Sequence, residues 1–172
     1  MKETRAVQSR LTPIDDNYQT CERTAATLRI STGAVHPEKV TELLGVNPTR
    51  VTILGERGPV NSVGIARVGK HNVWLLVSEG VVTSKDLRRH IDWIIDTVYP
   101  SKEALLRLQE LPEVKMDVSC VWWSRYGDGG PTLWPEQMSH LVELNLEISI
   151  AFSFYGDEAE PDVPGKKNGA GK

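Results

Sequence analysis

The feature that most constrains this chain is a strict alternation of apolar and polar side chains near its carboxyl end. Over ten residues, every second side chain is large and apolar, and polar or small residues fill most positions between. A two-residue period is typical of a β-strand that buries one face and exposes the other. The apolar set is Leu146, Ile148, Ile150, Phe152 and Phe154, and the intervening set is Glu147, Ser149, Ala151, Ser153 and Tyr155. The chain must therefore build a sheet with one covered face.

Other segments add strands to this sheet. Residues 26–31 and 116–122 alternate in the same way, which predicts two more half-buried strands. The run VWLLV at residues 73–77 is apolar throughout, as is typical of a central strand. Shorter strands are expected at residues 51–54 and near residues 65–68.

Helical periods lie between these strands. Apolar residues recur at spacings of three and four after Pro37 and within residues 83–98, 101–108 and 135–144. Thr83 or Ser84 is expected to cap the second of these helices, with Asp86 in its first turn. The resulting order, β-α-β-β-α-β-α-β, predicts an α+β fold: a ferredoxin-like βαββαβ sandwich extended by a further helix and strand. We expect an antiparallel or mixed sheet with its helices on one face.

Shifts in composition suggest the limits of the folded part. Residues 1–22 are polar and aperiodic, so we interpret them as a flexible leader. Residues 23–155 form a single α+β domain, which at this size needs no metal or disulfide to be stable. Residues 156–172 are first acidic and then rich in Gly and Lys, which predicts a disordered tail.

Charge excludes some partners and favours others. The net charge of −3 argues against a sequence-blind nucleic-acid coat, so no nucleic-acid partner is expected. Residues 1–90 carry +4 and residues 91–172 carry −7, an asymmetry compatible with an oriented protein contact. No secretory signal and no apolar run of about 18 residues is visible, which predicts a cytoplasmic protein without a membrane partner. Cys120 lies within an apolar strand pattern and is expected to be a buried small side chain.

The loop at residues 55–72 combines glycines with basic side chains. Arg57, Arg67, Lys70 and His71 lie there among four glycines. The loop could hold an anion, such as an acidic partner. The favoured interpretation is a mobile hairpin connection whose cations are solvated.

Several segments in the same order resemble a bacterial family. They are ATLRIS, HPEKVTELLGVNPT, VWLLVSEG, LRRHIDWIID, VSCVWWS and GDGGPTLWPEQM, followed by the closing strand. Together they resemble the family described as domain of unknown function 4279, over roughly residues 24–155. The resemblance implies the fold and a bacterial origin, and it carries no activity that could be transferred.

The uncovered face of the sheet is the candidate site. Trp122 and Trp123 are adjacent in a strand, so one points into the core and the other onto the open face. Tryptophan and arginine are typical anchors of protein interfaces. Asp117 and Glu147 are a possible carboxylate pair on neighbouring strands. The central run adds one of its two alternate sets to this face, either Trp74 and Leu76 or Val73, Leu75 and Val77. The candidate partner-binding residues are Arg29, Trp74, Asp117, Ser119, Trp123, Arg125 and Glu147.

These patterns favour a non-enzymatic module that binds a protein or another copy of itself through the open face. A small-molecule sensor or an enzyme at the same face remains an alternative, as does an immunity or antitoxin-like protein. No catalytic motif or metal-ligand spacing is present, so no cofactor and no metal site are expected.

Overall fold

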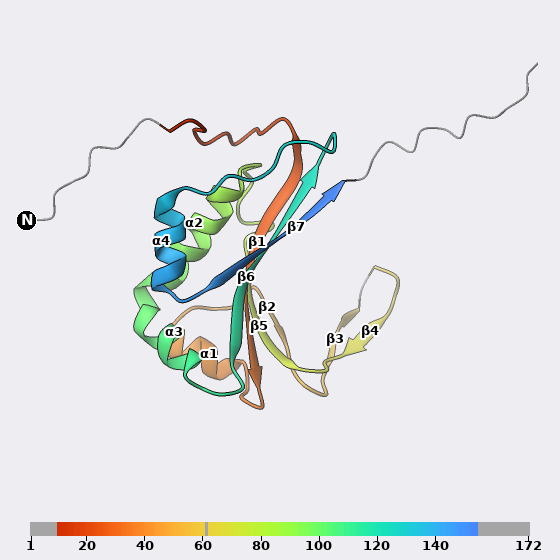
Figure 1. Cartoon of the computed structure of the whole chain (residues 1–172). Coiled ribbons are helices and arrows are strands. Elements are labelled where there is room, and N and C mark those ends of the chain that lie inside the picture. The colour runs from red at the N-terminus through yellow and green to blue at the C-terminus, as the bar shows by residue number, and fades with distance from the viewer. Residues whose placement is uncertain (1–9, 61, 155–172) are drawn as a thin grey trace, which may run out of the picture.

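The protein is described by a computed structural model, which covers residues 10–60 and 62–154 (Figure 1). Five strands form one sheet in the order β2 (Arg50–Thr52), β5 (Asn72–Val77), β1 (Cys21–Gly33), β6 (Lys115–Ser124) and β7 (Glu147–Phe154). Neighbouring strands are antiparallel, except that β6 and β7 are parallel. The strands β3 (Arg57–Val60) and β4 (Ala66–Val68) form a separate antiparallel hairpin.

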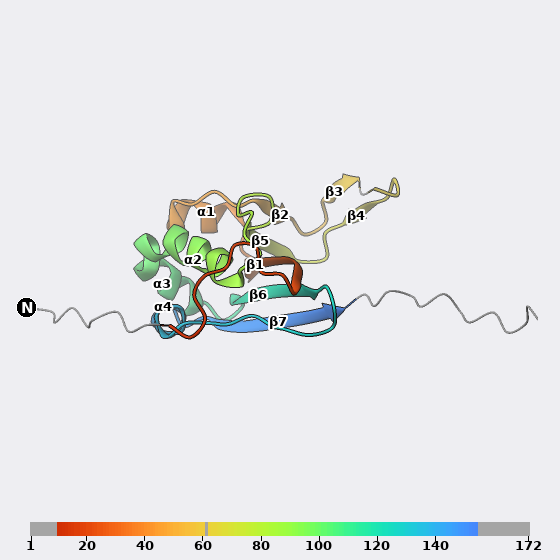
Figure 2. The same cartoon turned by 90° about the horizontal axis from the view of Figure 1, so that it is seen from above.

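The helices lie on one face of this sheet. They are α1 (Glu38–Leu44), α2 (Leu87–Val98), α3 (Lys102–Gln109) and α4 (Pro135–Glu143), and a short 3-10 turn, η1 (Tyr99–Ser101), joins α2 to α3. Figures 1 and 2 show all four on the same side, so the opposite side is an open face without a helix among the described residues. The predicted α+β class and mixed sheet are confirmed, whereas the ferredoxin-like topology stays a prediction.

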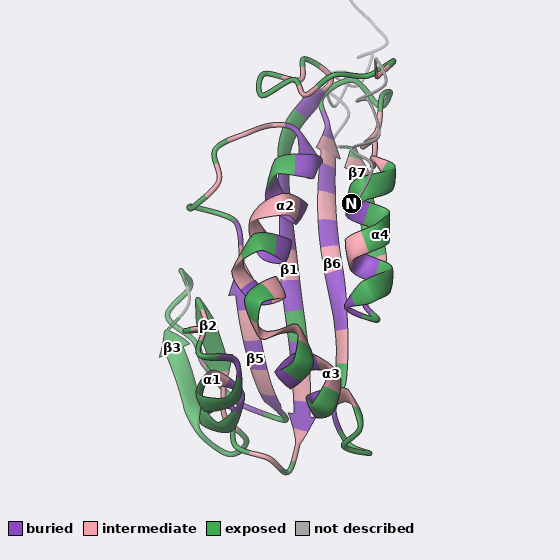
Figure 3. Cartoon of the chain, turned by 90° about the vertical axis from the view of Figure 1, so that its left-hand side faces the viewer, coloured by how far each residue is buried: buried purple, intermediate pink, exposed green. Residues whose placement is uncertain are grey.

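The core lies between the sheet and α2. Alternate residues of β1, such as Leu28 and Ile30, are fully buried, and so are Leu87 and Ile91 of the facing helix. Figure 3 shows the same alternation along β1 and β6, where buried residues are separated by more exposed ones. This is the pattern that the two-residue period predicts for a sheet covered on one side.

The described part of residues 1–22 is anchored to the folded domain. The guanidinium of Arg88, 1% exposed, donates hydrogen bonds to the carbonyls of Thr12 at 2.5 Å and Pro13 at 2.8 Å. The Tyr18 ring packs edge-on against Trp122, with 5.2 Å between ring centroids. These contacts fix residues 10–20 against the core, and β1 begins at Cys21. Residues 1–9 and the predicted tail lie outside the described part of the chain.

The cap of α2 differs from expectation. Asp86 rather than Thr83 or Ser84 is the capping residue, and its carboxylate accepts a hydrogen bond from the backbone N–H of Arg88. Ser84 supports the cap, because its hydroxyl accepts from the N–H of Asp86 at 2.9 Å. The same carboxylate accepts from the Arg88 side chain, so one aspartate both starts the helix and pairs a buried arginine.

Candidate functional site

Register places a polarised row of side chains across the open face. Leu75 of β5 pairs with Arg50 of β2 on one side and with Arg29 of β1 on the other. Arg29 in turn pairs with Asp117 of β6, which pairs with Glu147 of β7. We call these five residues the charged row. Its two cations lie toward the β2 edge and its two carboxylates toward the β7 edge.

The middle of the charged row is tied together within the chain. The Arg29 Nε donates to the Asp117 carboxylate at 2.8 Å, and the Asp117 side chain is only 11% exposed. The two ends are different: within residues 10–60 and 62–154, no ion pair is formed by Arg50 or by Glu147. The row therefore presents one free cation at one end and one free carboxylate at the other.

An aromatic anchor lies on the open face near the end of β6. The Arg23 guanidinium lies 3.5 Å from the centroid of the Trp123 ring, which is half-buried. Arg23 also pairs with Glu79 at 3.0 Å, and Arg125 pairs with Glu22 at 2.8 Å. The hydrogen bond from Arg125 lowers the pKa of the Glu22 carboxyl. The Arg23 contact holds the indole on the open face, as expected for Trp123.

Most of the predicted site residues lie on this side of the sheet, and one does not. Arg29, Asp117, Ser119, Trp123 and Glu147 share the open face by register, and Arg125 follows directly after β6.

Trp74 is the exception. It lies on the helix-covered face, is 0% exposed, and its indole N–H donates to the Thr41 hydroxyl at 3.1 Å. Its assignment to the open face was wrong, because β5 exposes the other alternate set, Val73, Leu75 and Val77. An uninterrupted apolar run carries no alternation from which the exposed set could be read.

Three hollows of the described surface lie away from the centre of the open face. Their volumes are about 1170, 590 and 470 Å³. Arg29, Ser119 and Trp123 line none of these three. None of these three hollows therefore gives Arg29, Ser119 or Trp123 the concave surroundings that a small ligand needs.

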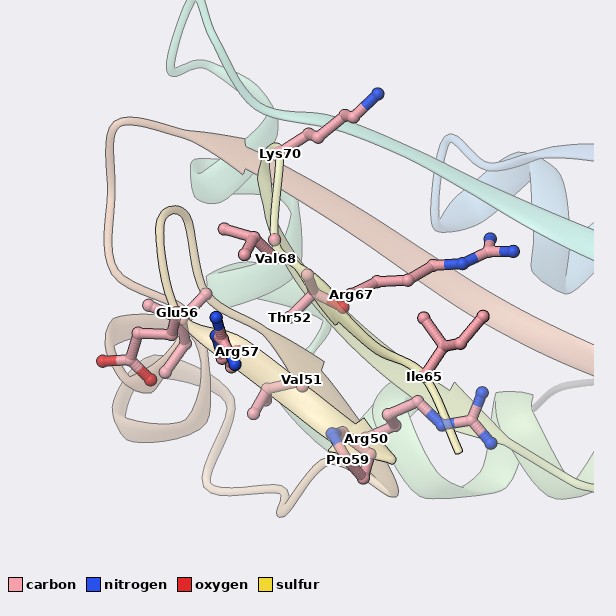
Figure 4. Close-up of a pocket in the computed structure, with 13 residues that line it drawn as sticks. Arg50, Val51, Thr52, Glu56, Arg57, Pro59, Ile65, Arg67, Val68 and Lys70 are labelled. Carbon is pink, nitrogen blue, oxygen red and sulfur yellow. The ribbon is translucent and has the colours of Figure 1, made fainter. Parts of the chain in front are cut away.

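The largest of these three hollows lies beside residues 55–72, which the sequence predicted to be a loop. The arm (residues 53–60 and 62–70) carries β3 and β4 and extends from the β2 edge to the side away from the helices (Figures 1 and 2). A cleft of about 1170 Å³ lies between it and β2, and Figure 4 shows the side chains that line it. Arg57, Arg67 and Lys70 line the cleft together with Arg50, whereas the predicted His71 does not. Arg50 was missed because it lies outside the loop that holds the other three.

The edge strand β7 carries a second exposed apolar group. Ile150, Phe152 and Phe154 point to the helix side but remain 40%, 49% and 48% exposed. Strand β7 pairs only with β6 in the described sheet. Proteins often protect such an edge with Lys, Pro or a bulge, and β7 contains neither Lys nor Pro. This edge is a second candidate contact surface besides the open face.

Both cysteine thiols are buried. Burial raises the pKa of the Cys120 thiol to about 12 and that of Cys21 to about 11, so neither is a thiolate at neutral pH. The expectation that Cys120 is a buried small side chain is confirmed. No group of three or more His, Cys, Asp and Glu side chains within the described ranges could hold a metal ion. None of the helices in these ranges is long and apolar enough to cross a membrane.

Comparison with known proteins links the chain to a family model. No curated protein and no solved structure matches it. Residues 20–155 match the model of a family described as a domain of unknown function, DUF4279. That range contains the whole sheet and all four helices of the described structure. The match covers most of the chain, which therefore belongs to the DUF4279 family.

Proposed function

We propose that this chain is a non-enzymatic binding module that pairs with a second copy of itself through the open sheet face. The observation that carries the proposal is the charged row, which is cationic toward β2 and anionic toward β7. A surface whose two halves have opposite charge is complementary to itself when a symmetry axis brings one half over the other.

The charged row selects the symmetry of the pair. When two open faces meet about a two-fold axis parallel to the strands, β2 of one copy lies over β7 of the other. Arg50 and Glu147 then face each other twice, once at each edge of the interface. A two-fold axis that lies between the two sheets and runs perpendicular to the strands would instead place β2 over β2, so that Arg50 of one copy would face Arg50 of the other. The aligned arrangement is also a usual way in which two sheets pack, about 10 Å apart.

The size of the open face suits such a pair. The lengths of the five strands and a spacing of about 4.8 Å give a flat footprint of roughly 600 Å². A stable interface buries about 800 Å² of accessible surface on each partner, and the accessible surface of protruding side chains exceeds their flat footprint. Apolar side chains on the face, among them Val73, Leu75, Val77 and Val121, are half-buried and would lose their remaining contact with water.

Sedimentation of the full chain tests the proposal. We expect a dimer at micromolar concentration. The Arg50→Glu and Glu147→Arg variants should each raise the dissociation constant by roughly tenfold or more, because each places two like-charge contacts in the interface. Neither residue forms an ion pair among the described residues, so the monomer fold should be unaffected. Arg107→Glu is the control, because Arg107 lies on α3, on the helix side of the sheet, and forms no ion pair among the described residues.

Two outcomes would overturn the proposal. One is a wild-type chain that stays monomeric throughout the micromolar range. The other is a dimer that is insensitive to Arg50 and Glu147 but is lost on Phe152→Lys, since Phe152 points to the helix side of β7. That second result would assign self-association to the β7 edge.

A further inference from the structure

The cleft beside the arm collects cations that have no carboxylate partner in the described part of the chain. Among the described residues, 15 are Lys or Arg and eight of these lie within 4.0 Å of a carboxylate, which leaves seven. Four of the seven line this one cleft: Arg50, Arg57, Arg67 and Lys70. Glu56 is the only carboxylate among the described residues that line it. Elsewhere the described chain pairs most of its basic side chains, so this concentration points to an external anion.

The positions of these cations indicate an extended anion. In Figure 4, the side chains of Lys70, Arg67 and Arg50 extend toward the same side of the view, and their charged ends lie one after another rather than at one point. Cations spread in this way do not converge on one phosphate group, whereas they can contact successive charges along a chain. The cleft also has apolar lining from Val51, Ile53, Pro59, Ile65 and Val68.

The chemistry of the lining favours a peptide over a nucleic acid. No aromatic side chain is among the described residues that line the cleft, so unpaired bases would have no ring on which to stack. Strand β2 pairs with β5 and has no other strand partner within the described sheet. A free strand edge can accept the backbone of an extended peptide as an added strand.

The base of the arm is held in place, so the cleft is present before a ligand binds. The backbone N–H of Gly55 donates to the carbonyl of Gly69 at 2.9 Å, and the N–H of Leu54 donates to the Asn72 side chain at 2.8 Å. A Cβ atom on Gly69 would lie 2.1 Å from the carbonyl oxygen of Ile53, so the two segments touch directly. A preformed site loses less entropy when it binds.

We propose that this cleft binds an extended acidic segment of another protein. The chain itself contains an acidic run, from Asp157 to Asp162. Arg50 lies about 30 Å from Phe154, since four strand spacings of about 4.8 Å and seven residues of about 3.3 Å separate them. Asp162 is eight residues beyond Phe154 and reaches at most about 29 Å. The chain's own acidic run would have to be fully extended to meet Arg50, at a high cost in conformational entropy, which favours a segment from a separate molecule. The dimer proposed above is not required. The two contacts share only Arg50, which faces Glu147 of the other copy in that dimer, so the peptide site is tested at Arg57 and Arg67.

Fluorescence anisotropy with a defined probe tests this site on the full chain. The probe is a fluorescein-labelled peptide that alternates Glu with Ala, and its control has Gln at every Glu. We expect binding of the Glu peptide that weakens at least roughly tenfold in the Arg57→Glu/Arg67→Glu variant and at high salt. Arg107→Glu/Lys115→Glu is the matched control, because it makes the same change in net charge at two unpaired cations outside the cleft. It should leave the affinity within about twofold.

Four results would overturn the inference. They are no binding of the Glu peptide at millimolar concentration, equal binding of the Gln peptide, equal losses in both double variants, and tighter binding of a single-stranded oligonucleotide.

A further result concerns the chain's own acidic run. If changing Asp157, Glu158, Glu160 and Asp162 to amides strengthens peptide binding roughly tenfold, that run occupies the cleft and the proposed source is wrong. Lys70→Gln, which changes a lining cation outside the charged row, gives a second, smaller perturbation if the double variant does not fold. It should also weaken binding, and unchanged affinity would contradict the site.

Discussion

Arginines in two regions of this molecule have opposite surroundings. Arg88 lies beneath residues 10–20, is 1% exposed, and donates to both carboxylate oxygens of Asp86 as well as to two backbone carbonyls. Arg57 and Arg67 of the arm are exposed and have no ion pair within the described residues. A charge removed from water must be fully partnered, whereas a charge left in water without a partner is available to a ligand. The difference separates charges that hold the fold from charges that can bind.

The largest effect that this difference predicts is the loss of the Arg88 pair. Arg88→Met should lower the free energy of unfolding by about 3–5 kcal/mol, because it leaves the buried Asp86 carboxylate without its partner. It should also release residues 12 and 13, whose carbonyls accept from Arg88. Urea denaturation measures the first effect, and hydrogen exchange in residues 10–20 measures the second. A loss below about 1 kcal/mol would show that the buried pair contributes little.

The adjacent tryptophans extend the contrast to the two faces of the sheet. Trp122→Ala should cost about 3–5 kcal/mol, because Trp122 is 1% exposed and the substitution leaves a cavity. Trp123→Ala should cost about 1 kcal/mol, since the ring is half-buried beneath Arg23. Urea denaturation compares the two variants, and the Trp123 variant should also weaken self-association. Equal losses of stability would contradict the assignment of Trp123 to the open face.

A moderate effect concerns pH and the buried His90. Burial lowers its pKa. Its Nε2–H donates to the Ser84 carbonyl at 2.8 Å, so its unprotonated Nδ1 accepts from the Ser78 hydroxyl at 2.8 Å. The unfolded chain therefore binds a proton more readily than the folded one. The stabilisation is complete above the unfolded pKa of about 6.5 and is lost as the pH falls toward the folded pKa.

We therefore expect the free energy of unfolding to decrease as the pH falls from slightly alkaline values to below the unfolded pKa of histidine. The His90→Gln variant should be less stable at both ends of this range but should show a smaller decrease. Urea denaturation of both proteins at the two pH values measures the difference. An equal decrease in the variant would assign the pH dependence to other groups.

Asp86 adds a separate dependence in acid. Burial by itself would raise the pKa of its carboxyl, but the hydrogen bonds and charge of Arg88 and the backbone N–H of Asp15 outweigh it, so the pKa is lowered. The stabilisation is present above the unfolded pKa of about 3.9 and is lost as the pH falls through the lower folded pKa.

The Asp86→Asn variant should therefore be less stable than wild type in weak acid but should lose less stability below about pH 4. An acid titration followed by circular dichroism compares the two proteins. Parallel losses in both would show that the Asp86 carboxyl does not govern the acid response.

The smallest effect is expected in the arm. Arg57→Gln/Arg67→Gln should change the free energy of unfolding by less than about 0.5 kcal/mol, because exposed side chains without partners contribute little to stability. Urea denaturation of this variant and of Arg88→Met compares the two losses in the free energy of unfolding. A large loss in the arm variant would mean that these cations hold the fold, and the distinction between the two regions would fail.

Particular residues show what the sequence could predict. The two-residue period of residues 116–124 and 146–154 correctly separated Trp122 from Trp123 and placed Asp117 and Glu147 on neighbouring strands. The two-residue period shows which residues of a strand share a face, because successive side chains alternate. This period does not show which strands pair, so the alignment of Arg50 with Arg29 through Leu75 became visible only in the structure.

Two features could not be predicted, for physical reasons. Arginine is rarely buried unless it is paired, and the carbonyl partners of Arg88 lie in a polar segment without any period, so nothing in the sequence indicated its burial. The arm was predicted only in part: the strand expected near residues 65–68 is confirmed by β4, whereas β3 and the cleft were missed, because short strands rich in Gly and basic residues carry no buried face. Figure 3 shows β3 exposed along its length.

Pairing through the open face is tested most directly by mixing the two edge variants. Arg50→Glu and Glu147→Arg should each sediment as a monomer at a concentration where wild type is a dimer, because each variant alone sets like charges against each other at both edges. In the mixed pair, one edge brings the two substituted positions together, and the other edge keeps the native pair of Arg50 with Glu147. Both contacts are then between opposite charges.

We therefore predict that the equimolar mixture recovers the dimer, while neither variant alone forms one. A mixture that stays monomeric, or single variants that remain dimeric, would contradict pairing through the open face.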